Sequence, residues 1–422
     1  MMNRFFYTCL LWAILPIVPI KLLLRGIKQP AYKQHWRERF GFYAIQTSKP
    51  VIWLHCVSVG ETRAAEPLIK ALQYHYPQHQ ILLTHTTPTG RETSHHLFGD
   101  SVICDYLPYD LPFAVNRFLK HFRPTIGLLM ETELWFNLIA SCKQQNIPLL
   151  LLNARLSEKS ANGYKKLGRL MANSLQDLSA IAAQTTDDAM RFQLLGAQNV
   201  SVYGNLKFDV KAPINITELG LQLRQLLIDD HAPKPRILFL AASMREGEEA
   251  LILDAVKDLN VLTIIVPRHP QRFNEVAALI ESRNIAYIRR TSLTAPVSSA
   301  IQVILGDSMN ELFTYYEACD FTFIGGSLLN FGGQNLIEAA SLSKPILIGK
   351  YTFNFADASK NAVSAGAAIR INNLDELRDG IALLADNLEK RQKMQQAALR
   401  FSEASQGATL RIMKLIDEYL PT

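Results

Sequence analysis

The chain has 422 residues, of which 48% are hydrophobic and 19% are charged. This is the composition of an ordinary globular protein, and the length favours two or three domains over one. Lys and Arg total 44 against 38 acidic residues. With no zinc-finger spacing, no aromatic-basic RNA-binding signature and no long basic run, so small an excess disfavours nucleic acid as a partner. The five cysteines form no CxxC pair, so neither a zinc site nor a disulfide framework is indicated.

The amino terminus carries an apolar segment followed by basic residues. Residues 5–24 are apolar except for Thr8 and Lys21, which is barely enough to span a membrane. Pro16 and Pro19 would kink a helix there, and the aromatic residues suit the interfacial zone, so an interfacial or tilted anchor competes with a true span. A signal peptide is disfavoured because no small-residue cleavage site follows. Positive charges after the segment place the main body on the cytoplasmic side.

From Pro50 onward, short apolar runs alternate with segments of helical period. Near-continuous apolar strands separated by helices predict a parallel sheet that is buried on both faces. The pattern occurs twice, so we predict an α/β fold with two Rossmann-like doubly wound domains that face a cleft. The predicted strands cover 51–57, 81–86, 102–106, 125–130, 148–153 and 180–184, and then 236–243, 261–267, 301–307, 321–326 and 345–349.

The domain boundary is predicted in the stretch 208–235, which carries three prolines and scattered charge. We therefore expect a membrane anchor and basic juxtamembrane segment over 1–32 and a first Rossmann-like domain over 33–209. A second Rossmann-like domain would cover 210–422, with terminal amphipathic helices packing back on the first.

Glu61 follows the first predicted strand, in the segment HCVSVGETRAAEPLI. At a carboxyl strand end this carboxylate could accept a proton from an incoming hydroxyl. Complementing the positive end of the following helix explains Glu61 equally well. Pro67 is compatible with a helix that starts just before it.

Two more acidic residues, Glu131 and Glu133, follow the fourth strand in METELWFN. If strand geometry persists, alternation places one of the two in the cleft; a capping acid and a solvated one are the alternative. Lys207, in GNLKFD at the domain junction, could neutralise leaving-group charge, although an isolated lysine is usually solvated.

The second domain offers a candidate anion site. Four glycines, at 325, 326, 332 and 333, precede a predicted helix, and such loops bind phosphate through free backbone amides. Arg268 could pair with a phosphate and Glu338 could accept hydrogen bonds from a ribose. Arg245 is a further candidate cation. Ser308 and Glu311 have the spacing of a helix capping box.

Several of these segments occur in one order along nearly the whole chain. They are SVGE, PTG (88–90), LPYDLP (107–112), METELWFN, NARLS (153–157), GNLKFD, PRHPQRF, GDSMNEL and GGSLLNFGGQNLIEAA. This set resembles the Kdo (3-deoxy-D-manno-octulosonic acid) transferase family of lipopolysaccharide synthesis. The resemblance implies a GT-B glycosyltransferase that transfers Kdo, with inversion, from CMP-Kdo to a primary hydroxyl of a lipid A precursor, a tetraacyl disaccharide. It places the enzyme on the cytoplasmic side of the bacterial inner membrane.

The resemblance also assigns roles to residues. Glu61 would be the general base, and Glu131 and Lys207 would support the transition state. No cofactor is implied, and no metal, because a leaving group with one phosphate can be stabilised by cations and helix amino termini. The CMP-binding residues would be Pro267, Arg268, Met309, Asn310, Glu311, Asn335, Leu336, Ile337 and Glu338.

The chain departs from the family pattern on the donor side. Family members commonly read GGHNPLE where this chain has GGQNLIE, and STHEGEE where it has SMREGEE. Gln334 keeps hydrogen bonding but carries no charge, while Arg245 could restore a cation nearby. Two alternatives stay open: a GT-B transferase or epimerase that uses a UDP-sugar, and a noncatalytic membrane-surface protein that binds a nucleotide or lipid.

Overall fold

A computed structural model describes residues 3–228 and 236–420. The chain divides into two compact units, the first made of 1–210 and 406–422 and the second of 211–405. The expected boundary at 209/210 thus lies one residue from the observed one. The last helix is grouped with the first unit, so unit 2 ends at 405, whereas the expected second domain ran to 422 with its terminal helices packing back on the first.

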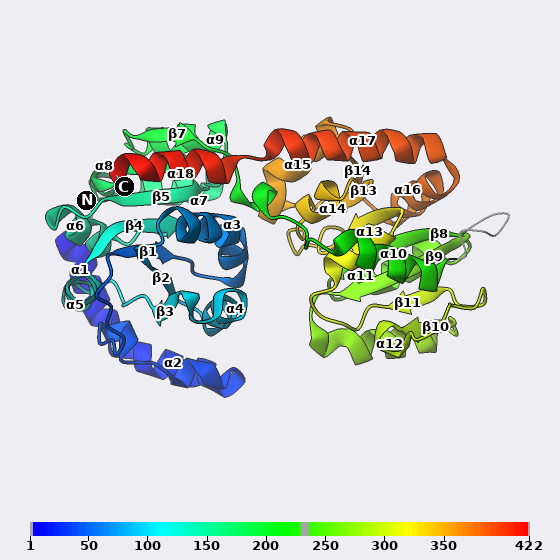
Figure 1. Ribbon diagram of the computed structural model, residues 1–422, viewed down its shortest axis with the longest axis horizontal. Helices are drawn as coiled ribbons and strands as arrows, with labels where there is room; N and C mark the ends of the chain where they lie inside the picture. The colour runs from blue at the N-terminus through cyan, green and yellow to red at the C-terminus, as the bar shows by residue number, and fades with distance from the viewer. Residues whose placement is uncertain (1–2, 229–235, 421–422) are drawn as a thin grey trace. The chain divides into compact units, whose positions relative to one another are not determined.

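Seven parallel strands form the sheet of unit 1, in the order β3-β2-β1-β4-β5-β6-β7 (Figure 1). The strands are β1 (Val51–His55), β2 (Gln80–His85), β3 (Ile103–Tyr106), β4 (Pro124–Met130), β5 (Leu149–Ala154), β6 (Ala180–Ala183) and β7 (Val200–Val202). The helices are α1 (Arg4–Ile14), α2 (Ile17–Lys28), α3 (Val59–His75), α4 (Pro88–Phe98), α5 (Pro112–Phe122), α6 (Phe136–Gln144), α7 (Glu158–Lys165), α8 (Arg169–Asp177), α9 (Thr186–Leu194) and α18 (Ala408–Tyr419).

Unit 2 contains a second sheet of seven parallel strands, in the order β10-β11-β9-β8-β12-β13-β14. The strands are β8 (Ile237–Met244), β9 (Val261–Pro267), β10 (Tyr287–Arg289), β11 (Val303–Leu305), β12 (Phe321–Ile324), β13 (Ile346–Gly349) and β14 (Ala368–Ile371). The helices are α10 (Ile216–Leu227), α11 (Glu248–Val256), α12 (Phe273–Ser282), α13 (Leu312–Ala318), α14 (Ile337–Ser341), α15 (Ala356–Ser364), α16 (Leu374–Asp386) and α17 (Leu388–Ser405). The predicted pair of doubly wound α/β domains is confirmed.

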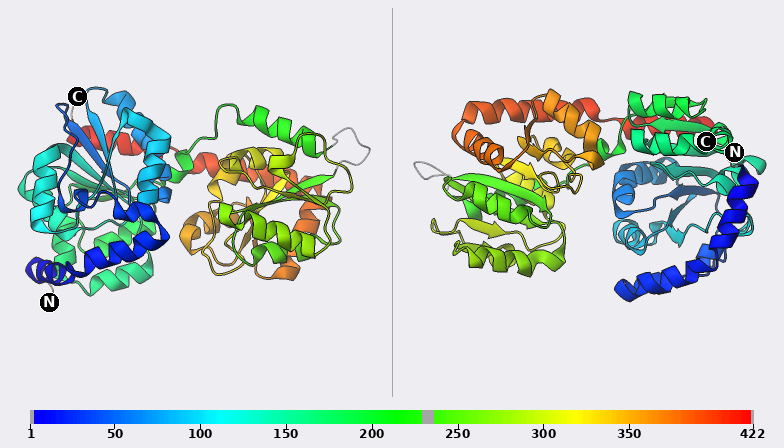
Figure 2. Two further views of the ribbon diagram at one scale, coloured as in Figure 1. Left: turned by 90° about the horizontal axis from the view of Figure 1, so that it is seen from below. Right: turned by 180° about the vertical axis from the view of Figure 1, so that it is seen from behind.

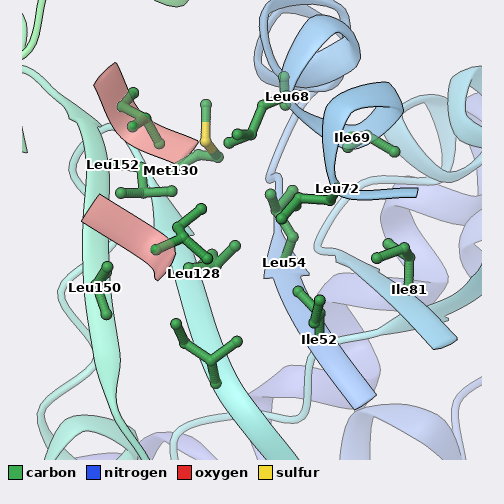
Figure 3. Close-up of a cluster of buried hydrophobic side chains, with 14 of the residues drawn as sticks. Ile52, Leu54, Leu68, Ile69, Leu72, Ile81, Leu128, Met130, Leu150 and Leu152 are labelled. Carbon is green, nitrogen blue, oxygen red and sulfur yellow. The ribbon is translucent and has the colours of Figure 1, made fainter. Parts of the chain in front are cut away.

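Helices cover both faces of the first sheet, which explains why its central strands are mostly apolar and buried. On one face Ile52 and Leu54 of β1 pack against Leu68 and Leu72 of α3 (Figure 3). The same cluster includes buried residues of α18, the red helix that accompanies the first unit in Figure 2. The other face packs against α5, α6 and α8. The carboxyl-terminal helix therefore completes the core of the amino-terminal unit.

The helix after β1 begins earlier than Pro67 suggested. Pro67 lies inside α3, which starts at Val59. A proline in a helix interior removes one backbone hydrogen bond. Here the buried face that includes Ala64, Leu68 and Leu72 outweighs that cost, because most helical stability comes from packing an apolar face.

The amino-terminal helices α1 and α2 belong to unit 1. In the described ranges no single helix is both long and apolar enough to cross a membrane; only α1 and residues 17–27 taken together reach that standard, and they meet at a bend of 56°. The hydroxyl of Tyr7 on α1 donates a hydrogen bond to Asp110 Oδ2 at 2.9 Å. Thr8 donates to Asn137 Oδ1 at 3.0 Å. Helix α1 is thus fixed to the α/β unit by polar contacts.

Candidate active site

An acidic cluster lies at the carboxyl ends of β1 and β4, the strands between which the order of the first sheet reverses. In doubly wound sheets ligands bind at this switch point, because the loops after the two strands diverge there. Glu61 follows β1, and Glu131 and Glu133 follow β4. The topology therefore brings Glu61 together with two carboxylates that lie about 70 residues later in the sequence.

Glu61 sits in the first turn of α3 and is buried. Its Oε2 accepts a hydrogen bond from the backbone N–H of Val57 at 2.7 Å, and its Oε1 accepts one from the Ser58 hydroxyl at 3.1 Å. Burial, and then the charge of Glu131, raise the pKa of Glu61 from 4.5 to about 8, against the lowering effect of these two hydrogen bonds. Glu61 is thus held in one orientation and has a proton affinity suited to a base near neutral pH.

Glu131 pairs with Lys207, which lies three residues before the first segment of unit 1 ends at Val210. Lys207 Nζ lies 3.1 Å from Glu131 Oε1, and the two side chains are 17% and 21% exposed. Because the pair is largely shielded from water, its attraction is stronger than that of a surface pair. The lysine therefore does not project freely into solvent, which was the alternative interpretation from the sequence.

Strand geometry does not persist to Glu131, so the expected alternation was wrong. Strand β4 ends at Met130, and Glu131 has a left-handed backbone with φ of 56°. Both Glu131 and Glu133 contribute to the raised pKa of Glu61. Burial, and less strongly Glu131, raise the pKa of Glu133 to about 6. The turn thus places both carboxylates in the electrostatic environment of Glu61.

Asn153 is a site residue whose role was missed from the sequence. It is fully buried at the end of β5, with φ of 51°. Its Oδ1 accepts a hydrogen bond from Leu206 N at 3.0 Å, and its carbonyl accepts one from Gln184 Nε2 at 2.9 Å. Leu206 precedes Lys207, so Asn153 positions the loop that carries the lysine. The NARLS segment was the available signal.

The second sheet has its switch point at β8, between β9 and β12. Arg245 follows β8, Arg268 follows β9 and the glycine-rich loop begins after β12. At Gly325 a Cβ atom would lie 2.5 Å from the carbonyl oxygen of Ser243. Only glycine allows the loop to approach β8 this closely. The predicted anion site therefore has its cations and its glycine loop on neighbouring strand ends.

Glu248 organises this loop, which the sequence did not predict. It is fully buried and accepts hydrogen bonds from the backbone N–H groups of Gly326, of Leu328 at 2.9 Å and of Leu329 at 3.2 Å. It also accepts one from Arg245 N at 3.1 Å. One carboxylate thus joins the loop after β8 to the loop after β12. The acidic segment SMREGEE was the available signal.

Three guanidinium groups lie near His269, which follows β9. Burial, and then the charges of Arg268, Arg245 and Arg272, lower the pKa of His269. Arg272 is paired with Glu249 at 3.4 Å, and the Arg245 guanidinium lies 4.6 Å from the centre of the Phe331 ring. The environment is cationic and suits an anion.

Gln334 participates directly in this cationic site. Its Oε1 accepts a hydrogen bond from Arg268 Nε at 3.2 Å. A Cβ atom at Gly326 would lie 3.1 Å from Gln334 Nε2 and 3.3 Å from Arg245 Cγ, so both side chains lie against this glycine. The two departures from the family pattern thus occupy one place in the fold.

The remaining predicted donor residues follow β11 and the glycine loop. Ser308 does not cap the next helix: α13 begins at Leu312 with Glu311 at its cap position, and the Ser308 hydroxyl instead donates to the Glu311 carboxylate. Arg290 also binds Glu311, at 2.8 Å. The capping-box prediction was therefore wrong, because the Ser308 and Glu311 side chains bond to each other and not to backbone N–H groups of the helix. Pro267 is buried at the end of β9, Met309 is exposed, and Asn310 has φ of 62°.

Asn335 and Glu338 are joined by a hydrogen bond. Asn335 Nδ2 donates to Glu338 Oε1 at 3.0 Å, while Asn335 Oδ1 accepts from Ile337 N at 3.0 Å. The side chains of Leu336 and Ile337 are buried in the core, so these residues can meet a ligand only through their backbone. Over the ranges that the structure describes, no three His, Cys, Asp or Glu side chains are grouped as metal ligands.

Comparisons with known proteins agree in both halves of the chain. A family model described as 3-deoxy-D-manno-octulosonic-acid transferase (kdotransferase) matches residues 34–210, and one described as glycosyl transferases group 1 matches 237–401. A 3-deoxy-D-manno-octulosonic acid transferase of Haemophilus influenzae is 38% identical over 429 residues, covering 99% of each chain. One of Bordetella pertussis is 36% identical over 440 residues, covering 99% of this chain and all of that one.

A solved structure gives the fold alone. The putative UDP-N-acetylglucosamine 2-epimerase from Listeria monocytogenes aligns with a TM-score of 0.59 at 15% identity, covering 88% of this chain and 97% of that one. This likeness supports the two-domain α/β architecture. The expected cleft between the domains stays a prediction.

Proposed function

The chain belongs to the 3-deoxy-D-manno-octulosonic acid transferase family, and from this premise we propose how its two units share the reaction. It is a glycosyltransferase that transfers Kdo. We propose CMP-Kdo as the donor and a primary hydroxyl of a lipid A precursor as the acceptor. Unit 1 would supply the base and unit 2 would bind the nucleotide.

Glu61 is proposed to take the proton of the acceptor hydroxyl. As the oxygen forms its bond to the anomeric carbon of Kdo, the bond from that carbon to the phosphate oxygen breaks and CMP leaves with the electron pair. A single displacement of this kind inverts the anomeric centre. The raised pKa of Glu61, about 8, supports this role because a stronger base accepts the proton more readily.

Glu131 and Lys207 are proposed to stabilise the transition state. Positive charge develops on the sugar ring as the leaving group departs, and a nearby carboxylate stabilises it. Lys207 Nζ, at 3.1 Å from Glu131 Oε1, holds this carboxylate in place. The pair thus supplies a preorganised charge that needs little rearrangement during the reaction.

Unit 2 is proposed to hold the CMP phosphate near Arg245 and Arg268. Both follow strands at the switch point of the second sheet, and Arg268 is oriented by Gln334. Guanidinium groups bind phosphate strongly and in a defined direction. The phosphate charge that grows as CMP leaves would be stabilised there.

Helix α1 is proposed to lie on the cytoplasmic face of the inner membrane. Phe5, Phe6 and Trp12 on this helix are 69%, 58% and 49% exposed, and such side chains suit the membrane interface. Changing Phe6 and Leu10 to Asp should move the protein from the membrane to the soluble fraction of disrupted cells. Unchanged fractionation would contradict this location.

The buried, hydrogen-bonded Glu61 carries the proposed mechanism. With purified full-length protein, CMP-Kdo and a tetraacyl disaccharide acceptor, we expect product with the mass of the acceptor plus Kdo. Glu61→Gln should lower kcat by about 10²-fold or more while CMP still raises the melting temperature. Glu66→Gln, on the same helix, is the matched control. Turnover near wild type in Glu61→Gln would refute the base, and stabilisation by UDP rather than CMP would refute the donor.

A further inference from the structure

A second charged site lies on unit 1, away from the carboxylate cluster. It is a hollow of about 950 Å³ whose lining includes five Lys and Arg side chains and no Asp or Glu. We call it the basic hollow. Its cationic residues are Arg37, Lys49, Arg117, Lys120 and Arg123, with His121 beside them.

The basic hollow lies at the amino ends of β1 and β4, whereas the proposed catalytic residues lie at their carboxyl ends. Pro50 and Arg123, which line it, immediately precede β1 and β4. Glu61 and Glu131 follow the other ends of these strands. A strand rises about 3.3 Å per residue, so the five residues of β1 place the two sites roughly 15 Å apart or more. The hollow therefore does not belong to the reaction site.

The cations of the hollow are not neutralised by the protein. All five are exposed, and none forms an ion pair with any residue in the described parts of the chain. Arg37 and Arg117 instead lie over the exposed ring of Phe42, at 5.7 and 4.2 Å from its centre. Uncompensated charge of one sign in a concave surface attracts the opposite charge.

A row of aromatic contacts connects the hollow to α1. The rings of Trp12 on α1 and Phe113 on α5 are 5.4 Å apart, and the Arg117 guanidinium lies 5.2 Å from the centre of Phe113. Helix α5 thus contacts the apolar helix through Phe113 and the hollow through Arg117 and Lys120. Exposed apolar side chains beside unpaired cations are the combination that binds an anionic lipid surface.

We propose that the basic hollow binds the phosphate headgroups of anionic lipids that surround the enzyme, as a site separate from that of the acceptor. The proposal rests on the proposed location of α1 at the membrane, and it adds a defined binding site for lipid headgroups. Apolar contacts of α1 would determine how deeply the enzyme enters the membrane. The hollow would select anionic bilayers and fix the orientation of unit 1.

Vesicle partitioning tests the site with the full-length protein. Binding to phosphatidylcholine vesicles with and without phosphatidylglycerol is compared for wild type, Arg117→Gln/Lys120→Gln and the control Lys257→Gln/Lys360→Gln. The control removes two exposed lysines of unit 2. We expect the first variant to bind anionic vesicles roughly thirty-fold less tightly, because the binding free energies of two membrane-proximal charges are lost together. The control should bind like wild type, and neutral vesicles should bind all three alike.

Three outcomes would overturn the proposal: equal binding of the first variant and wild type, an equal loss in the control, or displacement of wild type from vesicles by inorganic phosphate at constant ionic strength. The last would indicate a site for free phosphate. Transfer to detergent-dispersed acceptor is measured alongside and should be unchanged in the first variant. Reduced transfer with unchanged vesicle binding would assign the hollow to the acceptor. Absence of transfer in wild type would count against the proposed reaction and leave the vesicle result readable.

Discussion

The pH dependence of transfer should report the protonation of Glu61. With a pKa of about 8, roughly a tenth of Glu61 is deprotonated at about pH 7 and roughly nine-tenths at about pH 9. A base must be deprotonated to act, so kcat/KM should rise about ten-fold over this interval. The rise has this sign because burial and the charge of Glu131 disfavour the ionised form.

Replacing Glu131 should move this profile in a defined direction. Glu131→Gln removes the larger of the two carboxylate charges that raise the pKa of Glu61, and Glu133→Gln removes the smaller. The midpoint should therefore be highest in wild type, lower in Glu133→Gln and lowest in Glu131→Gln. Burial, the largest cause, remains in both variants, so neither midpoint should return to 4.5.

The assay is the initial rate of Kdo transfer at subsaturating acceptor in detergent, across buffers of constant ionic strength. The midpoint of kcat/KM belongs to the free enzyme and is read independently of how much the absolute rate falls. Glu66→Gln serves as the control that should leave the midpoint unchanged. A profile that is flat between about pH 6 and about pH 9, or an unchanged midpoint in Glu131→Gln, would refute Glu61 as the titrating base.

Three further changes should separate the remaining contacts. Lys207→Met leaves Glu131 without its partner, so the kcat/KM midpoint should move above that of wild type; a downward shift would contradict the pairing. Gln334→Leu removes the acceptor for Arg268 and should weaken CMP binding about ten-fold with kcat little changed, as measured by calorimetric titration. Glu248→Gln leaves buried N–H groups without an acceptor, so calorimetric melting should show unit 2 destabilised by about 2 kcal/mol or more, whereas unchanged melting would show that the loop does not depend on this carboxylate.

The central strands could be predicted from the sequence because both of their faces are buried. Strands β7, β10 and β14 were missed, and each lies at an edge of its sheet; the fourth edge strand, β3, was predicted. Val200–Val202 of β7 is mostly exposed and Tyr287–Arg289 of β10 only partly buried. An edge strand needs no continuous apolar run, so the hydrophobic pattern alone did not reveal these three.

The candidate site was predictable as far as strand ends, but not in its contacts. The pairing of Lys207 with Glu131 joins residues 76 positions apart, which no local pattern reveals. The left-handed conformations of Glu131 and Asn153 were also unpredictable, because they follow from neighbouring strands that fix the backbone. Position along the sequence indicated the candidate site residues, and the fold determines which of their side chains are in contact.

The order of the strands explains how one architecture supplies opposite electrostatics. The strand order of both sheets reverses at the first strand, β1 in unit 1 and β8 in unit 2, and polar loops follow the strands there in both. In the first unit these loops carry Glu61 and Glu131, and their mutual repulsion raises a proton affinity. In the second they carry Arg245 and Arg268 around a glycine loop. A neutral hydroxyl that must lose a proton suits the first environment, and a departing phosphate suits the second. In the proposed mechanism, the chemistry of the transfer is divided by charge between these two switch points.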